Sequence, residues 1–413
     1  MRVGIIGGGL SGLAAADVLK KHGEEVVIFE SSNQLGGLAS SFDFDGEAVP
    51  KFYHHVFKHD WITRKSLERF GCEIGRFSKI NMSILANGKT YDFTNPLGLL
   101  RFDYLSLLGR FRYGLFGAYV YSLMNPAKLP EKLDADTWLK KAVGKEVTSK
   151  VFFELYARNK FGIPLNEISA KQFAHRMKAK EFLGHFGYPS LGLDTWINRF
   201  GESLKKRDVD IRFNQKISSL KDKVITTERK KEEFDIVINT APTPAFLSFA
   251  VIPEHYRSQL SKIRYCPVVS VVFKSENFVN PFYWNNLLRE HAHVLIQHSM
   301  INDRFSYKVG WISKYGDSGK DFPLTDEQIV KKYLMDLKKY SPNAKIIATR
   351  VFRQPFSEPI YDVNYPKVMP RTTTPLPWLF NAGIATTYPK IRNMNTALES
   401  GVDTARIIIK NFK

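Results

Sequence analysis

The glycines near the start of the chain have the spacing of a phosphate-binding turn. Gly7, Gly9 and Gly12 directly follow the apolar residues 3–6, and Glu30 ends the next apolar run. In this spacing the first glycine makes the tight turn, the second lets the backbone approach a pyrophosphate, and the third lets a helix pack closely on the strand. The acidic residue is placed to accept ribose hydroxyls and disfavours a 2′-phosphate. The sequence therefore predicts a dinucleotide site to which NADP fits poorly.

Three elements must position these residues. The apolar patterns predict strands at 3–6 and 26–29 and a helix over 13–21 that stops before Gly23. In such a βαβ unit the phosphate lies at the helix N-terminus, where unpaired backbone N–H groups point at it. Further contacts with the cofactor are expected from Leu10, Ser11 and Ser31.

A second pair of glycines follows Glu30 within the segment 34–41. Gly36, Gly37 and Leu38 resemble the double-glycine motif of the group of FAD-dependent enzymes that contains amine oxidases, protoporphyrinogen oxidases and phytoene desaturases. The resemblance implies that these residues extend a site for the FAD diphosphate. That group usually has arginine after the glycine pair, so with Leu38 one neutralising charge is missing or comes from elsewhere.

The C-terminal part resembles the closing half of the FAD site in the same families. Residues 378–383 predict a strand that turns at a glycine, and residues 395–412 predict a helix whose N-terminus would face the flavin. Ile384 stands where those families often have Asp or Glu, so a backbone contact must replace the carboxylate. The resemblance implies contacts with FAD, through backbone amides in the last two cases, at Gly383, Ile384, Met394 and Asn395.

Strand patterns in the middle of the chain complete the expected fold. Those at 209–217 and 234–242 resemble the strands that return the chain to the FAD, which implies contacts at Ile217 and Ala241. Further strand patterns lie between 265 and 315. We expect an α/β fold with a Rossmann-like, glutathione reductase-type FAD-binding domain and an interleaved substrate domain of helices and an antiparallel sheet. The expected FAD-binding domain is 1–75, 205–250 and 350–413, and the substrate domain is 76–204 and 251–349.

Three histidines and three aromatic residues lie within the segment 52–59. His54 and His55 would point apart on a strand, and neither an acidic residue nor a cysteine is near, so no metal site is predicted. The segment resembles the Gly-Pro-His-Ile-Phe-His stretch of UDP-galactopyranose mutase, whose first histidine lies beside the isoalloxazine ring. His55 matches that histidine. The resemblance implies a catalytic or flavin-tuning imidazole; a histidine that only fills the core is the alternative.

Candidate contacts with the substrate lie in other segments. Arg158, on an aromatic and basic helical pattern, could bind a diphosphate or face solvent, and Arg353 and Tyr361 precede the C-terminal strand. The run 91–127 is rich in Leu, Phe and Tyr and is interrupted by arginines. Such helices line an apolar cavity, lie on an anionic membrane surface or pack as core.

Composition limits the classes of partner. The chain has 413 residues, and 60 Lys and Arg against 41 Asp and Glu give a net charge of +19, which favours anionic partners. The lysines are spread along the chain, so nucleic acid is not expected. The longest uncharged apolar run is shorter than the roughly 18–20 residues that cross a bilayer. Two distant cysteines indicate neither a disulfide framework nor zinc. We expect a cytoplasmic protein, with peripheral association with anionic membrane as an alternative.

The resemblance implies an FAD-dependent oxidoreductase that transfers hydride between a small-molecule substrate and flavin N5. The substrate would be hydrophobic or carbohydrate-derived. The alternative is a non-redox nucleotide-sugar mutase that resembles UDP-galactopyranose mutase. A second dinucleotide motif is not evident, so the other electron donor or acceptor would dock transiently. The sequence makes no prediction of the oligomeric state.

Overall fold

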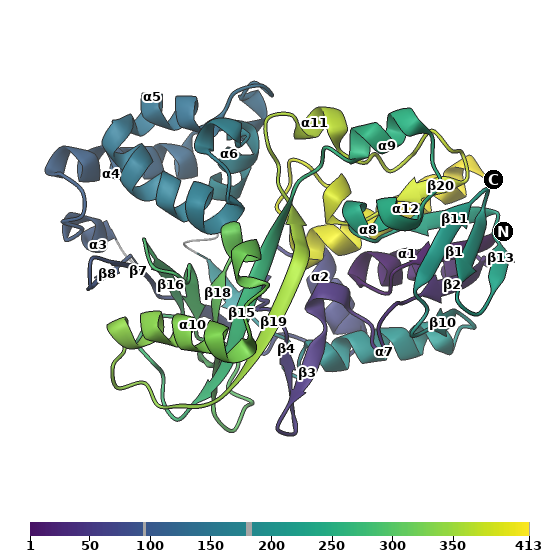
Figure 1. Cartoon of the computed structure of the whole chain (residues 1–413), viewed down its shortest axis with the longest axis horizontal. Coiled ribbons are helices and arrows are strands. Elements are labelled where there is room, and N and C mark those ends of the chain that lie inside the picture. The colour runs from purple at the N-terminus through teal and green to yellow at the C-terminus, as the bar shows by residue number, and fades with distance from the viewer. Residues whose placement is uncertain (94–95, 179–183, 413) are drawn as a thin grey trace.

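The chain forms two adjoining parts, one beside both termini and one at the opposite end (Figure 1). The computed structural model describes residues 1–93, 96–178 and 184–412. Residues 94–95 of the apolar run and 179–183 of the expected substrate domain lie outside the described residues, as does residue 413.

The part beside the termini is built on a parallel sheet with the strand order β10-β2-β1-β14-β20. Its strands come from separated segments of the chain. Val3 on β1, for example, pairs with Val26 on β2 and with Ile236 on β14. Alternate residues face two hydrophobic layers, which gives the continuous apolar runs of a sheet buried on both faces. The strands are β1 (Arg2–Ile6), β2 (Glu25–Phe29), β10 (Asp210–Arg212), β14 (Ile236–Asn239) and β20 (Leu379–Asn381).

Helices cover one face of this sheet, and a small sheet and two helices cover the other. Two of the helices, one with Ser11 and one with Gly401, cross so closely that no side chain fits between them. A Cβ on Gly401 would lie only 2.1 Å from the carbonyl oxygen of Ser11. The first face has α1 (Leu10–Lys21), α2 (Trp61–Arg69), α7 (Leu193–Lys205) and α12 (Met394–Asn411). The second has β11 (Ile217–Lys221), β12 (Val224–Thr227), β13 (Lys231–Glu233), α8 (Thr243–Phe249) and α9 (Glu254–Leu260), with α11 (Tyr365–Val368) nearby.

A seven-stranded sheet with the order β19-β15-β18-β17-β16-β7-β8 forms the base of the other part. It is antiparallel except where β16 runs parallel to β7, so the expected antiparallel sheet is in fact mixed. Helix α10 (Asp326–Tyr340) packs on one face. The strands are β7 (Met82–Ala86), β8 (Lys89–Asp92), β15 (Tyr265–Ser275), β16 (Trp284–Leu287), β17 (Val294–Ile296), β18 (Lys308–Lys314) and β19 (Ile346–Pro359).

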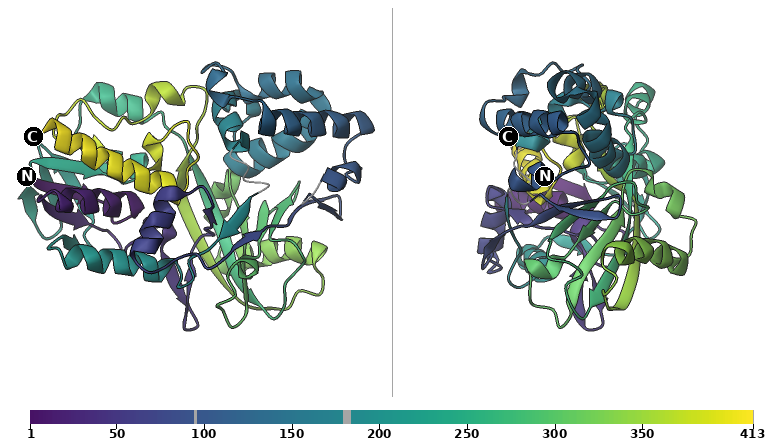
Figure 2. Two further views of the ribbon diagram at one scale, coloured as in Figure 1. Left: turned by 180° about the vertical axis from the view of Figure 1, so that it is seen from behind. Right: turned by 90° about the vertical axis from the view of Figure 1, so that its left-hand side faces the viewer.

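A layer of helices lies beyond this sheet, at the end of the molecule farthest from both termini (Figures 1 and 2). It consists of α3 (Pro96–Leu100), α4 (Leu107–Ser122), α5 (Ala135–Val147), the π-helix η3 (Thr148–Phe161) and α6 (Ala170–Lys178). Aromatic side chains from α4, η3 and α6 pack edge to face in its core.

Short strands connect the two parts. The strands are β3 (Ser41–Phe44), β4 (Glu47–Pro50), β5 (Val56–Phe57), β6 (Phe77–Lys79) and β9 (His185–Gly187). The strand expected across the histidine segment covers only β5, and both His54 and His55 lie in the connection before it. The sequence predicts that the two imidazoles point to opposite sides of a strand. This prediction is wrong, because neither histidine lies in a strand.

Candidate active site

The N-terminal glycine turn has the geometry that its spacing predicts. Gly7 has φ +104°, and a Cβ on Gly12 would lie 2.1 Å from the carbonyl oxygen of Gly7. A Cβ on Gly9 would meet no atom within 4 Å, so this glycine faces open space. Helix α1 begins after Gly9 without a side-chain cap and without an acidic residue in its first turn. Its first N–H groups therefore fit a phosphate.

Glu30 is held at the end of β2 by backbone donors. Its carboxylate accepts hydrogen bonds from the N–H groups of Gly8 and Ser32, both at 2.8 Å, and the Ser31 hydroxyl lies at 3.4 Å. This arrangement fixes the carboxylate beside the glycine turn, which fits the ribose of an adenosine.

The second glycine pair packs against the first turn. The Gly36 N–H donates to the Gly8 carbonyl at 2.9 Å, and a Cβ on Gly37 would lie 3.4 Å from the Gly9 Cα. Both Gly36 and Gly37 have positive φ. The structure also places a cation here that the sequence did not single out. Burial lowers the pKa of Lys51, and the charge of Glu30 acts against that shift.

The C-terminal part of the expected FAD site lies beside the N-terminal glycine turn. Gly383 has φ +116°, and a Cβ there would lie 3.9 Å from the Ser11 hydroxyl oxygen, which itself donates to the Ala397 carbonyl. The Ile384 carbonyl accepts a hydrogen bond of 2.6 Å from the Tyr361 hydroxyl. Most of the loop 383–393 is half-buried, so its backbone remains accessible beside α1.

Several other residues predicted to contact FAD have side chains that pack in the core or cap a helix. Leu10 and Ile217 are buried in the two hydrophobic layers of the parallel sheet, and Met394 is buried at the start of α12. The Asn395 side chain accepts hydrogen bonds from the N–H groups of Ile62 and Thr63, so it caps α2. At these positions a contact with FAD would be made by the backbone, as it would at Ala241, which follows β14, and at Leu38, which is half-buried in the second glycine turn.

His55 lies in an aromatic cluster. Its ring stacks on Phe186 with centroids 3.9 Å apart and an interplanar angle of 5°, and Nδ1 lies 3.4 Å from the Tyr283 hydroxyl. Burial, with the charges of His54 and Arg176, lowers the pKa of His55 to about 3. The side chain nevertheless stays partly accessible.

We expect His55 to remain neutral between about pH 5 and pH 8, because its pKa is lowered to about 3. NMR titration of the imidazole, assigned by comparison with His55→Gln, should show no protonation step in this range. A His55 step near pH 6 would contradict its placement.

A cluster of buried charges lies close to His55. Arg392 is 1% exposed and bonds to Glu358 at 2.8 Å, and Lys160 bonds to the same carboxylate at 2.6 Å. Burial opposes ionisation of Glu358, but the charges of Arg392, Lys160 and Arg176 outweigh it and lower its pKa to about 2. Tyr53 links the cluster to the histidine, because its ring lies 6.2 Å from the His55 ring and 6.4 Å from the Tyr315 ring, over which the Lys160 ammonium lies. Two cations, Lys160 and Arg392, share the one carboxylate of Glu358.

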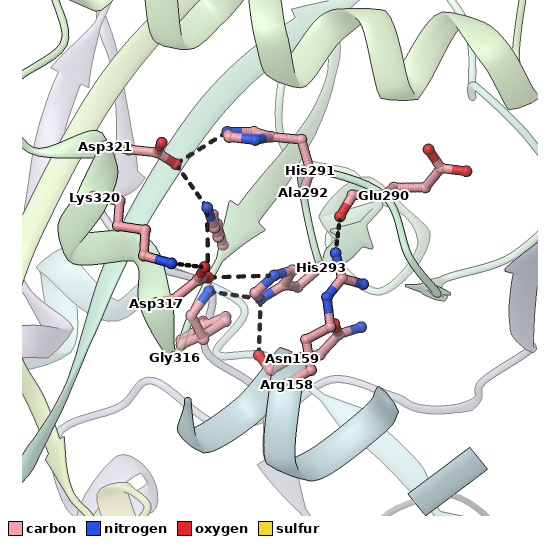
Figure 3. A network of polar contacts seen from close by, with 12 residues as sticks. Arg158, Asn159, Glu290, His291, Ala292, His293, Gly316, Asp317, Lys320 and Asp321 are labelled. Carbon is pink, nitrogen blue, oxygen red and sulfur yellow. Dashed lines mark hydrogen bonds and ion pairs between the residues drawn. The ribbon is translucent and has the colours of Figure 1, made fainter. Parts of the chain in front are cut away.

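Of the three predicted substrate contacts, only Tyr361 joins this cluster, with its ring 4.3 Å from the Arg392 guanidinium carbon. Arg158 instead donates to the Glu290 carbonyl at 2.9 Å, beside the contacts of His293 with Asn159 and Asp317 (Figure 3). Arg353 bonds to Asp326 and to the Leu324 carbonyl. The structure therefore does not bring Arg158 and Arg353 together with Tyr361.

The parallel sheet, the two packed glycine turns and the crossing of α1 with α12 define an FAD-binding flavoprotein. The profile of the family described as flavin containing amine oxidoreductase matches residues 10–409. The chain belongs to this family of FAD-dependent oxidoreductases, and its cofactor is FAD.

Curated relatives match only short segments. An uncharacterized protein of Methanocaldococcus jannaschii is 34% identical over 105 residues, which are 25% of this chain and 26% of that protein. An L-amino acid oxidase of Cerastes cerastes is 36% identical over 85 residues, which are 19% of this chain and 16% of that enzyme. The matches thus span about a quarter and a sixth of these relatives.

Solved structures share the whole fold. A protoporphyrinogen oxidase-like protein of Exiguobacterium sp. 255-15 has a TM-score of 0.79 at 17% identity, with 99% of both chains covered. Reduced UDP-galactopyranose mutase has a TM-score of 0.80 at 13% identity, covering 99% of this chain and 96% of the mutase. Putrescine oxidase bound to putrescine has a TM-score of 0.77 at 15% identity, with 99% of both covered. These identities indicate a shared fold alone.

Proposed function

We propose that this protein oxidises a substrate bound beside His55, with hydride transfer to the flavin. The bound FAD supplies the hydride acceptor, N5. The observation that carries the proposal is the aromatic cluster around His55, a partly exposed residue whose ring packs against those of Phe186 and Trp284. Because burial keeps this imidazole uncharged near neutral pH, it can hydrogen-bond the flavin or the substrate and tune the electronics of the flavin.

The charged residues around Glu358, close to His55, limit the class of substrate. Lys160 and Arg392 both pair with the single carboxylate of Glu358, and an excess of positive charge beside the site repels a protonated amine. We infer a substrate with a hydrophobic or carbohydrate-derived body and an anionic group rather than a cationic diamine. Anaerobic mixing with carboxylates, phosphates and amines of matched size tests this. Loss of the oxidised flavin absorbance with anionic compounds supports the inference, and reduction by amines alone contradicts it.

The same cations support a second candidate, a non-redox nucleotide-sugar mutase. Arg392 and Lys160, with Tyr361, offer the positive and aromatic contacts that a uridine diphosphate needs. Uridine diphosphate should be titrated into the oxidised and the dithionite-reduced protein while the flavin spectrum is recorded. A response that is stronger in the reduced protein favours the mutase, and a silent flavin favours the oxidoreductase.

The location of the protein in the cell is also a proposal. Among the described residues no helix is long and apolar enough to cross a membrane, and no group of His, Cys, Asp and Glu could hold a metal ion. We propose a cytoplasmic enzyme that acts on a small molecule. Fractionation of cells that express the chain tests its location.

A further inference from the structure

Helix α4 exposes an unusual number of large apolar side chains. Leu107 is 78% exposed and Leu123, the residue that follows the helix, is 79% exposed. On α3, Leu97 and Leu100 are 62% and 65% exposed. We define the α3–α4 apolar face as Leu97 and Leu100 on α3, Leu107, Leu108, Phe111, Leu115 and Tyr119 on α4, and Leu123 directly after α4.

The members on α4 form one continuous stripe. An α-helix turns by about 100° per residue, so positions 107, 108, 111, 115, 119 and 123 fall within an arc of about 160°. The opposite side of α4 buries Phe116 and Val120 in the core. A helix that is apolar on both sides belongs against a second apolar medium.

The connection between α3 and α4 is held by hydrogen bonds and carries an excess of positive charge. The Arg110 guanidinium donates to the carbonyls of Leu100 and Leu105 at 2.6 and 3.0 Å and so holds α3 against α4. Arg101 and Arg112 are exposed beside the face. The acidic residue in this stretch, Asp103, is paired with Lys89 at 2.7 Å. An apolar stripe with cations at its rim is the pattern of a helix that lies in the interface of an anionic bilayer.

We propose that the α3–α4 apolar face docks this enzyme on the surface of a membrane that contains anionic phospholipid. Helix α4 has 16 residues, is about 24 Å long and would lie along the surface rather than across it. Helices α3 and α4 lie at the end of the molecule farthest from both termini, and so away from the FAD-binding part (Figures 1 and 2). The proposal does not depend on the identity of the substrate.

A second copy of the chain suits this face less well. A two-fold contact places the same patch of both copies together, so the arginines at the rim of both copies would be gathered in one interface. Like charges across an interface oppose association, whereas phosphate headgroups neutralise them. The charge of the rim therefore favours anionic lipid as the occupant.

The test uses the full FAD-loaded chain and sedimentation with vesicles. The vesicles are of phosphatidylcholine alone or of phosphatidylcholine mixed with phosphatidylglycerol. The variant carries Leu107→Ser, Phe111→Ser and Leu115→Ser. Its matched control carries Val251→Ser, Met335→Ser and Ile347→Ser, at apolar positions that are 53%, 63% and 47% exposed elsewhere. Flavin content and thermal unfolding show that each protein is folded.

We expect the unmodified chain and the control to bind the anionic vesicles, and the α4 variant to bind at least about tenfold more weakly. Arg101→Gln with Arg112→Gln should remove most of the preference for anionic vesicles and most of the salt dependence. Equal binding by the α4 variant and the unmodified chain would overturn the proposal, as would no binding by the unmodified chain. A dimer in solution that the α4 variant converts to monomer would overturn it in favour of a second copy.

Discussion

Replacing Gly12 with alanine is expected to yield a protein that retains little FAD and unfolds more easily. The new Cβ would lie 2.1 Å from the carbonyl oxygen of Gly7 and 3.3 Å from its carbonyl carbon. Both atoms are backbone in the turn that must hold the diphosphate, so the strain cannot be relieved by a side-chain rotation. Overpacking of this kind lowers the free energy of unfolding by about 1–3 kcal/mol. We expect flavin content after purification to fall at least about tenfold.

Gly9→Ala separates the loss of cofactor from the loss of stability. In the protein without ligand its Cβ meets no atom within 4 Å, so the apoprotein should be as stable as the unmodified apoprotein. The same Cβ would occupy the space where the pyrophosphate approaches the backbone, so FAD should bind more weakly. Denaturant unfolding of both apoproteins and titration with FAD measure the two effects. Unchanged FAD affinity in Gly9→Ala would contradict the assignment of this turn.

Glu358→Gln is expected to lower the free energy of unfolding by about 3–5 kcal/mol, because it leaves buried cations without their counter-charge. The glutamine keeps the shape of the side chain, but the charges of Arg392 and Lys160 then face a neutral amide. Glu399→Gln is the matched control. Its carboxylate also pairs with a lysine at 2.8 Å, but the pair is exposed, so a change of less than about 1 kcal/mol is expected.

The stabilisation by Glu358 should also depend on pH in a defined direction. The pKa of Glu358 is lowered from the usual 4.5 to about 2 in the folded protein. The stabilisation is therefore complete above about pH 4.5 and is lost as the pH falls towards about 2. Unfolding of the native protein and of Glu358→Gln should differ most near neutral pH and converge in acid. A difference that stays constant down to pH 2 would show that the effect is not one of charge.

The local parts of the fold could be predicted from the sequence, and the parts that depend on distant contacts could not. The first glycine turn and Glu30 are encoded by spacing within one βαβ unit, so a dinucleotide site could be inferred from the residues, whereas FAD and the fold class followed from the resemblance of the second glycine pair and later segments to a flavoprotein group. The partners of His55 could not, because Phe186 and Tyr283 come from remote segments.

The predicted substrate contacts show the same limit. Arg158 and Arg353 are charged residues in suitable-looking segments, but nothing local indicates that their partners are the Glu290 carbonyl and Asp326. The sequence does not identify Arg392 as a candidate site residue, although it lies two residues before α12. The reason is that its carboxylate partner, Glu358, belongs to the end of β19. The parallel pairing of β16 with β7 likewise joins segments about 200 residues apart, which no local pattern encodes.

The order of the strands in the parallel sheet also determines when the enzyme can mature. During synthesis β1 and β2 are made first, whereas β14 and then β20 follow much later. Until β20 and α12 have been made, β14 has an unpaired edge, and α1 lacks the helix that crosses it at Gly401. The cofactor site can therefore close only after both of these late elements have been synthesised, and we expect the open sheet to be prone to misassembly before then.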